Sequence, residues 1–487
     1  MQGLVEAIQI EMKHDNDNLY TFPLTSTGYV RRDAKKALSE IDCRFVKNQL
    51  PNYEIYKMLR EAFRGGNTHA NRFYTNYTLH DVHSADRSSS YPDVMCNCKF
   101  PISEFYSLGE IPYSEVVKML GRRQKACLMR VAITGLYLRR FDWGCPYLSI
   151  GKCRHIENAL EDNGRIISAD YLETTLTDID LKIVISEYSW TDIRFYDFAT
   201  SRYGYLPKPL IKTICQYYHF KTELKNVPGQ ELLYLKSKNK LNSLYGMCAQ
   251  DPVKQSILFV DNDFKEQNEN EEELLIAYNK KAFLAYQWGV WVTAWARYRL
   301  EEGIQLAHGD IDNPKAPQFI YCDTDSVKYL GEIDWTKFNN ARITDSKKNG
   351  AYATDPCGVT HYMGVFEKEH DMCEFKTMGA KKYVYRETTN DELVCTIAGV
   401  SKNIGGKELE EHGGIEAFKE GFTFEKAGGL EAVYNDTGYG TYIVKDGQTL
   451  GEAVEITSNV VLRESTYTLG LTEDYKRLLT QCRYEYE

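Results

Sequence analysis

Two segments of the chain carry apolar residues at helical spacing. In one, three tryptophans and a valine follow the i, i+3, i+4, i+7 pattern of a single helix face: Trp288, Trp291, Val292 and Trp295. In the other, residues 229–248, apolar side chains fall on one side of the expected helix: Leu241, Leu244 and Cys248. We therefore expect two helices whose apolar faces pack against the rest of the protein.

Residues 316–330 show a different pattern, in which apolar runs flank the polar tip Asp323-Thr324-Asp325-Ser326. This pattern predicts a strand, a tight turn and a second strand. The polar and acidic stretch 261–273 predicts the tip of an exposed hairpin or loop. Glycine pairs beyond residue 400 predict turns between short helices and strands: 405–406, 413–414 and 428–429.

Length and charge narrow the possible classes of protein. At 487 residues the chain can form several domains. The formal net charge of −10 argues against a simple basic nucleic-acid-binding module, but it allows an enzyme whose cationic residues line one channel. Thirteen scattered cysteines without a CxxC pair indicate a reducing compartment. We expect neither a signal peptide nor a membrane-spanning segment, because the start is acidic and long apolar runs are missing.

The sharpest chemical signal is the pair of carboxylates in the predicted turn. Asp323 and Asp325 stand two residues apart at a hairpin tip, where a hard cation such as Mg²⁺ would compensate their charge. An ordinary polar turn is the alternative, because Asp310 and Asp312 repeat the spacing in a loop rich in Gly, Asn and Pro. Spacing alone therefore does not decide between a catalytic pair and a structural turn.

The expected helix 229–248 carries polar residues opposite its apolar side. Lys238, Asn242 and Tyr245 lie at positions i, i+4 and i+7 and so share one face. A lysine can neutralise a triphosphate, and a tyrosine ring can pack on a base or a sugar. Taken alone, the same pattern also fits an ordinary amphipathic helix.

A third stretch, Asp86-Arg87-Ser88-Ser89-Ser90-Tyr91-Pro92, places a carboxylate at the end of a strand, just before a turn. Such a carboxylate can share metal ions with the aspartates of the hairpin. Asp81 and Asp93 are competitors that spacing alone does not dismiss.

Together, the three stretches resemble the motifs of family B DNA polymerases, commonly written DxxSLYP, KxxxNSxYG and YxDTDS, in the order found here. The resemblance favours Asp86 over its neighbours, because only Asp86 leaves Ser89, Tyr91 and Pro92 in register. Phe63-Arg64-Gly65-Gly66 resembles the YxGG element, and Lys381-Lys382-Tyr383 resembles the KxY element that holds the primer strand. The likeness is greatest to the protein-primed phage-type branch.

The resemblance implies an α+β right-hand fold with an antiparallel-sheet palm, helical fingers, a small thumb and two insertions. The implied parts, in chain order, are an N-terminal remnant (1–54), the first part of the palm (55–92), a first insertion resembling the terminal-protein region (93–212), the fingers (213–250), a second insertion with a hairpin (251–284), the rest of the palm (285–412) and the thumb (413–487).

The resemblance also implies an activity, that of a DNA-directed DNA polymerase adding dNTPs to a 3′ hydroxyl by two-metal phosphoryl transfer. Its implied catalytic residues are Asp86, Asp323 and Asp325. Its implied metal ligands are Asp86, Asp325 and the carbonyl of Arg87, which would hold two Mg²⁺ ions, and Mn²⁺ can substitute. The dNTP would contact four side chains: Tyr91, Lys238, Asn242 and Tyr245. The implied DNA-binding residues are Phe63, Arg64, Gly65, Gly66, Ser89, Ser243, Gly246, Thr324, Lys381, Lys382 and Tyr383.

The sequence departs from the family pattern at Ser90, where a leucine is usual, and in the polar strand 80–85, so we expect a less tightly packed palm strand. Family exonucleases lie upstream of YxGG, and too few residues precede Phe63 for such a domain, so we expect no 3′–5′ exonuclease in this chain. The expected partners are a primed or protein-primed DNA template, dNTPs, a separate exonuclease subunit and a terminal protein, in the cytoplasm of a bacterial host.

Three other interpretations remain. The chain could be a catalytically weak polymerase relative that acts as a DNA-binding replication scaffold, although all three carboxylates and Lys238 are present. An RNA-templated polymerase usually has adjacent aspartates in its hairpin, whereas Thr324 separates them here. A hydrolase with a carboxylate pair would leave Lys238 and Tyr245 without a purpose.

Overall fold

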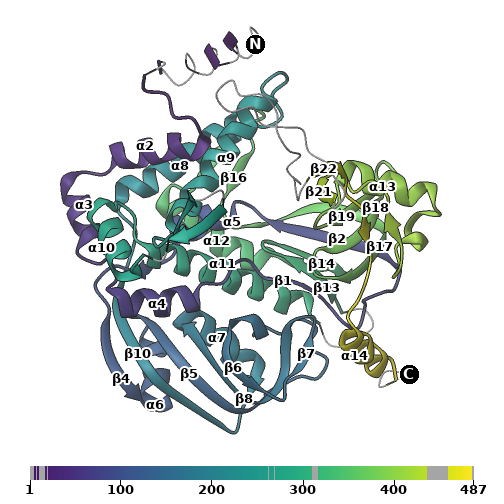
Figure 1. The fold of residues 1–487 in the computed structure, drawn as a ribbon, viewed down its shortest axis with the longest axis horizontal. Coiled ribbons are helices and arrows are strands. Elements are labelled where there is room, and N and C mark those ends of the chain that lie inside the picture. Colours follow the sequence, from purple (N-terminus) through teal and green to yellow (C-terminus); the bar gives the residue numbers. More distant parts are fainter. Residues whose placement is uncertain are drawn as a thin grey trace, which may run out of the picture.

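The computed structural model describes residues 20–260, 263–267, 269–309, 316–435 and 459–484, with a few isolated positions before residue 20. Two antiparallel sheets lie on either side of one long helix, α11 (Tyr286–Ala307), and further helices cover one end of the molecule (Figure 1). Trp288, Trp291 and Val292 of α11 are fully buried, which confirms the predicted packing face, whereas Trp295 is half-buried. None of the described helices is long and apolar enough to cross a membrane.

The first sheet has seven strands in the order β1-β13-β14-β2-β17-β18-β19, all antiparallel. The strands are β1 (Thr68–Ala70), β2 (Leu79–Arg87), β13 (Gln318–Asp323), β14 (Ser326–Leu330), β17 (Phe366–Gly379), β18 (Lys382–Glu387) and β19 (Leu393–Ile397). The strand, turn and strand predicted for residues 316–330 are confirmed as β13 and β14. Residues before and after the second sheet in sequence therefore build one sheet together.

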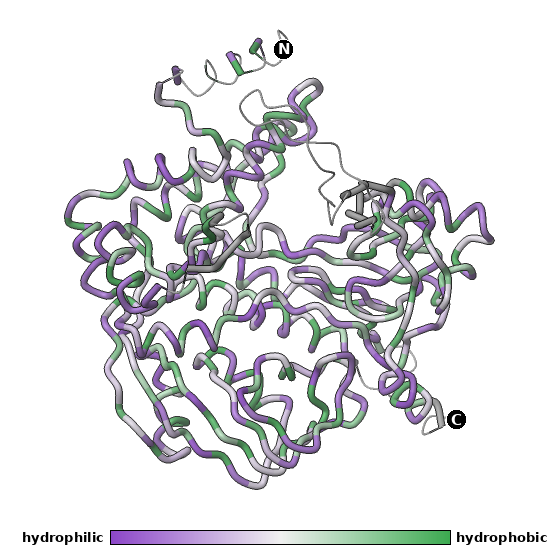
Figure 2. The backbone as a smooth tube through the Cα atoms, viewed as in Figure 1, coloured by the Kyte–Doolittle hydropathy of each residue, from purple (hydrophilic) through white to green (hydrophobic). Residues whose placement is uncertain are grey.

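Strand β2 lies in the middle of this sheet although it is largely hydrophilic (Figure 2). Its apolar residues Val82 and Ala85 are fully buried. Its polar residues are satisfied by the neighbouring strand β17: His83 Nδ1 lies 2.6 Å from Asp371 Oδ1, and the Ser84 hydroxyl donates to Glu369 Oε2 at 3.1 Å. The polar strand is thus held by side-chain hydrogen bonds in place of apolar contacts.

The second sheet has eight strands, with β5, β8 and β10 at its centre. The strands are β3 (Phe100–Pro101), β4 (Tyr106–Ile111), β5 (Lys125–Leu138), β6 (Cys153–Glu157), β7 (Leu160–Asp162), β8 (Arg165–Thr177), β9 (Tyr188–Ser189) and β10 (Asp192–Gly204). Three short elements accompany them: α6 (Tyr113–Arg122), α7 (Asp178–Glu187) and the 3₁₀ turn η1 (Ile150–Lys152). This sheet and its helices occupy the lower half of Figure 1.

Helices cover the end of the molecule opposite the second sheet. They are α2 (Ser26–Ala37), α3 (Glu40–Lys47), α5 (Ser90–Asn97), α8 (Lys208–Glu223), α9 (Glu231–Cys248) and α10 (Glu271–Lys281). Helix α4 (Tyr53–Ala62) packs instead against β5 and β8 of the second sheet. Helix α9 is the helix predicted for residues 229–248, and its apolar side is buried as expected. The predicted boundary between residues 212 and 213 falls inside α8, which packs against α9.

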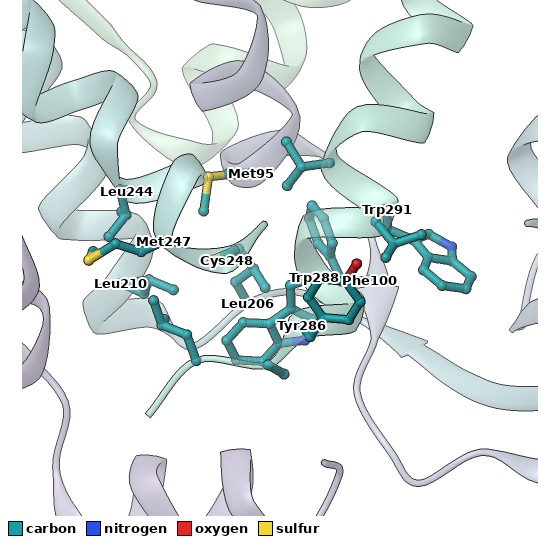
Figure 3. Packing of buried hydrophobic residues seen from close by; sticks show 14 of the residues in the cluster. Met95, Phe100, Leu206, Leu210, Leu244, Met247, Cys248, Tyr286, Trp288 and Trp291 are labelled. Atoms are coloured by element: carbon teal, nitrogen blue, oxygen red, sulfur yellow. The ribbon is translucent and has the colours of Figure 1, made fainter. Parts of the chain in front are cut away.

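Side chains from α5, α8, α9 and α11 meet in one apolar core (Figure 3). Its labelled members on these helices are Met95, Leu210, Leu244, Met247, Cys248, Tyr286, Trp288 and Trp291. Because α11 also contacts β13 and β14, this core connects the helical end of the molecule to the turn between those strands.

The acidic stretch 261–273 is a hairpin only in part. Strands β11 (Ser256–Val260) and β12 (Asp263–Gln267) pair as a hairpin whose tip lies outside the described residues. Glu271, Glu272 and Glu273 then form the first turn of α10, capped by Asn270. Acidic side chains suit that position, because they complement the positive end of the helix dipole.

The remaining elements are mostly short. Three of them lie between β14 and β17 of the first sheet: α12 (Thr336–Asn349), β15 (Tyr352–Thr354) and β16 (Thr360–Tyr362). The others follow that sheet: α13 (Lys402–Glu411), η2 (Gly414–Ala417), β20 (Thr423–Phe424), β21 (Leu430–Asn435), β22 (Asn459–Glu464), β23 (Tyr467–Thr468) and α14 (Glu473–Tyr484). The turn predicted at 405–406 is wrong, because both glycines lie inside α13. A Cβ at Gly406 would stand 2.1 Å from the Leu393 carbonyl, so the glycine is needed for the helix to approach β19.

Candidate active site

The turn between β13 and β14 rests on residues 63–66, which we call the FRGG segment, and on the residues just after it. Thr324 at the tip has a positive φ of 60°, and its N–H donates to the Asn67 carbonyl at 2.7 Å. A Cβ on Gly66 would stand 2.6 Å from Thr324 Oγ1. Gly66 therefore makes room for the turn, whereas a Cβ on Gly65 would meet nothing within 4 Å.

Asp86 and Asp325, which we call the carboxylate pair, come together through strand pairing. Asp86 stands opposite Ser326 in the register of β2 and β14, and the Arg87 N–H donates to the Asp325 carbonyl at 2.8 Å. Within the described part of the chain, neither carboxylate forms an ion pair or accepts a hydrogen bond from another side chain. Burial raises the pKa of Asp86, and the charge of Asp325 raises it further; burial likewise raises the pKa of Asp325.

Asp323 differs from the carboxylate pair because its charge is compensated. The Lys381 ammonium lies 2.6 Å and 2.5 Å from its two carboxylate oxygens, and the Thr68 hydroxyl donates to Oδ1 at 3.0 Å. Lys381 itself has a positive φ, and its N–H donates to the Tyr321 hydroxyl at 3.0 Å. The KxY element is thus tied to the turn through both its backbone and its lysine.

A cavity of about 710 Å³ opens between the carboxylate pair and helices α8 and α9. Residues of the three sequence motifs line it: Asp86, Ser88, Ser89, Ser90, Tyr91, Pro92, Lys238, Asn242, Tyr245, Gly246 and Asp325. The rings of Tyr91 and Tyr245, both in its lining, stack on each other with centroids 4.1 Å apart. Side chains that are far apart in sequence therefore face one space large enough for a nucleotide.

The sequence reasoning missed two lysines, a histidine and two glutamates of this cavity: Lys221, Lys225, His361, Glu367 and Glu369. The Lys221 ammonium donates to Ser89 Oγ at 3.2 Å, and burial together with the nearby charge of Lys238 lowers its pKa to about 8. Glu369 lies where the pairing of β17 with β2 is interrupted by a bulge, a device that re-aims a side chain. No spacing distinguishes these residues from the chain's other lysines, histidines and glutamates.

Four predicted DNA-binding residues are not free to point into the cavity. The Arg64 guanidinium is buried and donates to the Thr175 carbonyl at 2.8 Å, so this side chain points into the protein and not into the cavity. Phe63 packs against Tyr286 with ring centroids 6.4 Å apart. The remaining two polar groups are engaged with backbone carbonyls: Lys382 Nζ with Gly470 at 3.0 Å and Ser243 Oγ with Asn239 at 2.7 Å.

Tyr383 is buried behind the turn, where its ring centroid lies 4.8 Å from that of Tyr321.

Asp93, one of the two alternatives to Asp86, forms a structural ion pair: its Oδ2 lies 2.5 Å from the fully buried guanidinium of Arg87. Ser90, the departure from the family pattern, accepts a hydrogen bond from the same guanidinium at 2.9 Å. Asp81 is exposed on β2, and Asp310 and Asp312 lie outside the described residues.

The carboxylate pair suits a hard divalent cation. Two like charges held side by side without cationic partners are stabilised when such an ion binds between them. Among the described side chains, no group of three or more His, Cys, Asp or Glu forms a ready-made metal cage.

Comparison with known proteins places this site in a family. Residues 35–288 match the family model described as DNA polymerase type B, organellar and viral. The DNA polymerases of Bacillus phages Nf and B103 are each 23% identical to the chain, and the matches cover 96% of it and 70% of theirs. Phi29 DNA polymerase superposes with a TM-score of 0.66 in its complex with primer-template DNA and incoming nucleotides, and of 0.67 in its post-translocation complex.

These two structures are 19% and 18% identical to the chain, and the superpositions cover 96% of it and 70% and 71% of theirs. They confirm the expected mixed right-hand fold with antiparallel sheets. The family match over more than half of its residues shows that the chain belongs to the organellar and viral type B DNA polymerases and is a DNA-directed DNA polymerase.

Proposed function

We propose that the chain extends the 3′ end of a primed DNA template with dNTPs, using divalent metal ions held by Asp86 and Asp325. The observation that carries this proposal is the carboxylate pair itself, which forms no ion pair with the described residues and lies at one side of a nucleotide-sized cavity. The structural neighbour in complex with primer-template DNA and nucleotides supports the proposed substrates.

The metal site would contain the two carboxylates and the backbone carbonyl of Arg87, with Glu369 as a further carboxylate at its edge. When bound, two divalent ions, Mg²⁺ or Mn²⁺, would polarise the attacking 3′ oxygen and neutralise the departing pyrophosphate. The protein holds its own part of the site rigid through strand pairing, so the carboxylates need little rearrangement during the reaction.

The opposite wall of the cavity would receive the incoming nucleotide. Lys238 and Lys221 are placed to neutralise the triphosphate. Tyr91 would pack beneath the sugar and exclude a ribose 2′-hydroxyl, while Tyr245 supports the Tyr91 ring from α9. Asn242 lines the same wall and would hold the base or sugar edge.

The primer end would lie near Asp323 and the KxY element. Lys381, half-exposed beside Asp323, is the cation best placed to contact the primer backbone. Gly65 leaves open space beside the turn, which would let the template strand approach the main chain. Priming by a terminal protein stays a prediction, which transfer of a labelled dNMP to such a protein would test.

Primer extension by the purified chain with Mg²⁺ tests the proposal. We expect the wild type to extend a primed template and Asp325→Asn to lose extension. Asp81→Asn is the matched control, because Asp81 is an exposed aspartate of β2 with a positive φ that asparagine tolerates. Loss of extension in both variants, or its retention in Asp325→Asn, would contradict the assignment. A wild type that binds primed DNA without extending it would favour the scaffold interpretation.

A further inference from the structure

A buried lysine lies behind the carboxylate pair. Lys328 on β14 is only 4% exposed. Its ammonium lies 5.2 Å from the ring centroid of Tyr383 and 5.9 Å from that of Tyr321, and it donates to the Ser84 hydroxyl at 3.5 Å. In the described residues, no carboxylate lies within ion-pair distance of this ammonium. Burying a charge without an ion pair is costly, so its presence in the sheet calls for a function.

Strand register places Lys328 on the same face of the sheet as Asp86. Lys328 stands opposite Ser84, and the next pair on that face is Ser326 opposite Asp86. The Ser84 hydroxyl donates in turn to Glu369 Oε2 at 3.1 Å. A short chain of polar contacts therefore runs from the Lys328 ammonium to a carboxylate at the edge of the cavity.

The charges on this face are unevenly balanced. Asp86, Asp325 and Glu369 gather at the cavity, while Lys381 is occupied by Asp323. Burial lowers the pKa of Lys328, and the charges of Glu369, Asp323 and Asp86 act in the opposite direction and favour its charged form. Lys328 is thus a cation built into the floor of a site that is otherwise anionic on this side.

We propose that Lys328 is a resident counter-charge of the carboxylate pair, which lowers the affinity of the substrate-free site for divalent ions and holds Glu369 in position through Ser84. A cation fixed nearby disfavours the binding of another cation. Tight occupation of the site by metal then depends on the phosphates that arrive with the nucleotide. This inference rests on the proposed metal site, and Lys328 acts in it as a positioning residue.

The test is titration of the whole chain with Mn²⁺, in the absence of DNA and dNTP and at mildly alkaline pH, with free ion measured by electron paramagnetic resonance. We expect Lys328→Met to bind Mn²⁺ about tenfold more tightly than wild type. Lys328→Gln, which keeps a donor for Ser84, should show the same gain, and Lys328→Arg, which keeps the charge, should not.

Lys376→Met is the matched control. Lys376 is a buried lysine of the same sheet, 6% exposed, but its ammonium faces Glu416 at 3.7 Å and not the cavity. Its loss should leave Mn²⁺ affinity unchanged. A second readout is steady-state extension, where the two neutral variants should require less Mn²⁺ for half-maximal rate while the arginine variant follows wild type.

The sign of the effect separates a counter-charge from mere structural support. Unchanged or weaker Mn²⁺ binding in both folded neutral variants would overturn the inference, because lost support can only loosen the site. If Lys328→Met fails to fold, Lys328→Gln carries the same test. Failure of the wild type itself to bind Mn²⁺ would instead refute the proposed metal site.

Discussion

Two buried groups of acidic side chains in this polymerase have opposite electrostatics. The carboxylate pair, Asp86 and Asp325, stands without ion pairs, and burial raises the pKa of both. Asp180 at the start of α7 is also buried, but Arg297 Nη2 lies 2.7 Å from its Oδ1 and the Tyr147 hydroxyl donates to the same oxygen. Burial alone would raise the pKa of Asp180, yet these partners lower it to about 2.

The difference shows how buried charge separates a reactive site from a structural one. Asp180 has exchanged water for protein donors, which makes it part of the scaffold. The carboxylate pair has lost water without gaining such partners, which leaves it able to accept a metal ion or a proton. Arg297 also contacts the FRGG segment beside the active site, because its guanidinium donates to the Gly65 carbonyl at 2.8 Å.

The largest expected effect comes from removing charge from the carboxylate pair. Asp86→Asn and Asp325→Asn should each lower the rate of single-nucleotide addition by about 10³-fold or more, because the metal ligands are lost. Folding should not suffer, since each change removes an unpaired buried charge. Rapid-quench extension and thermal melting together check this, and a melting midpoint well below that of wild type would contradict it.

The second prediction removes the guanidinium of Arg297, which compensates the charge of Asp180. Arg297→Met leaves Asp180 buried without its cation and should lower the free energy of unfolding by about 3–5 kcal/mol. Denaturant unfolding measures the change. In Arg297→Met/Asp180→Leu, part of the loss should be recovered because the uncompensated carboxylate is removed; a double variant less stable than the single one would contradict this account.

Gly65 and Gly66 of the FRGG segment lie beside the turn that holds Asp323 and Asp325. Only Gly66 approaches the turn so closely that a Cβ would clash. Gly66→Ala would place a Cβ 2.6 Å from Thr324 Oγ1 and displace the turn, so we expect about a tenfold to hundredfold loss of extension rate. Gly65→Ala meets open space within the protein and should leave stability unchanged. Extension rates and melting midpoints of the two variants test this, and equal rates would show that the turn yields without cost.

The smallest expected effect concerns the cation that faces the carboxylate pair across the cavity. Because the pKa of Lys221 is lowered to about 8, its charge is present below that pH and is lost as pH rises through it. The kcat/KM for dNTP should therefore fall several-fold between about pH 7 and pH 9. Lys221→Arg, charged throughout, should lack this fall, and an unchanged profile would exclude Lys221 as its origin.

The sequence predicted the parts of the site that carry local patterns. The hairpin of Asp323 and Asp325 follows from apolar runs that flank a polar tip, the helix bearing Lys238 follows from helical periodicity, and both were found. Asp86 could be chosen over Asp81 and Asp93 only through resemblance to a motif. The structure gives the physical distinction, because Asp93 is neutralised by Arg87 and Asp81 is exposed.

Other features depend on contacts between distant segments and left no local signal. Lys221 reaches the cavity because α8 packs against α9, and Glu369 does so through a bulge between β17 and β2. Arg64 was expected among the DNA-binding residues, but its side chain is buried against the second sheet, where it donates hydrogen bonds to β8. Gly405 and Gly406 serve close packing of α13 against β19 instead of a turn. The expected lack of an exonuclease stays a prediction.

The order of strands in the first sheet has a consequence for synthesis of the protein. Strand β2 pairs with β14 and β17, and the contact between Ser84 and Lys328 spans 244 residues of chain. During synthesis on the ribosome, β2 emerges long before β14 and β17. Because β2 is hydrophilic, it can stay exposed to water without aggregating. The second sheet and its helices have only to fold within themselves in the meantime. The polymerising site is therefore completed late in synthesis, when β14 and β17 pair with β2, which has stayed soluble until then.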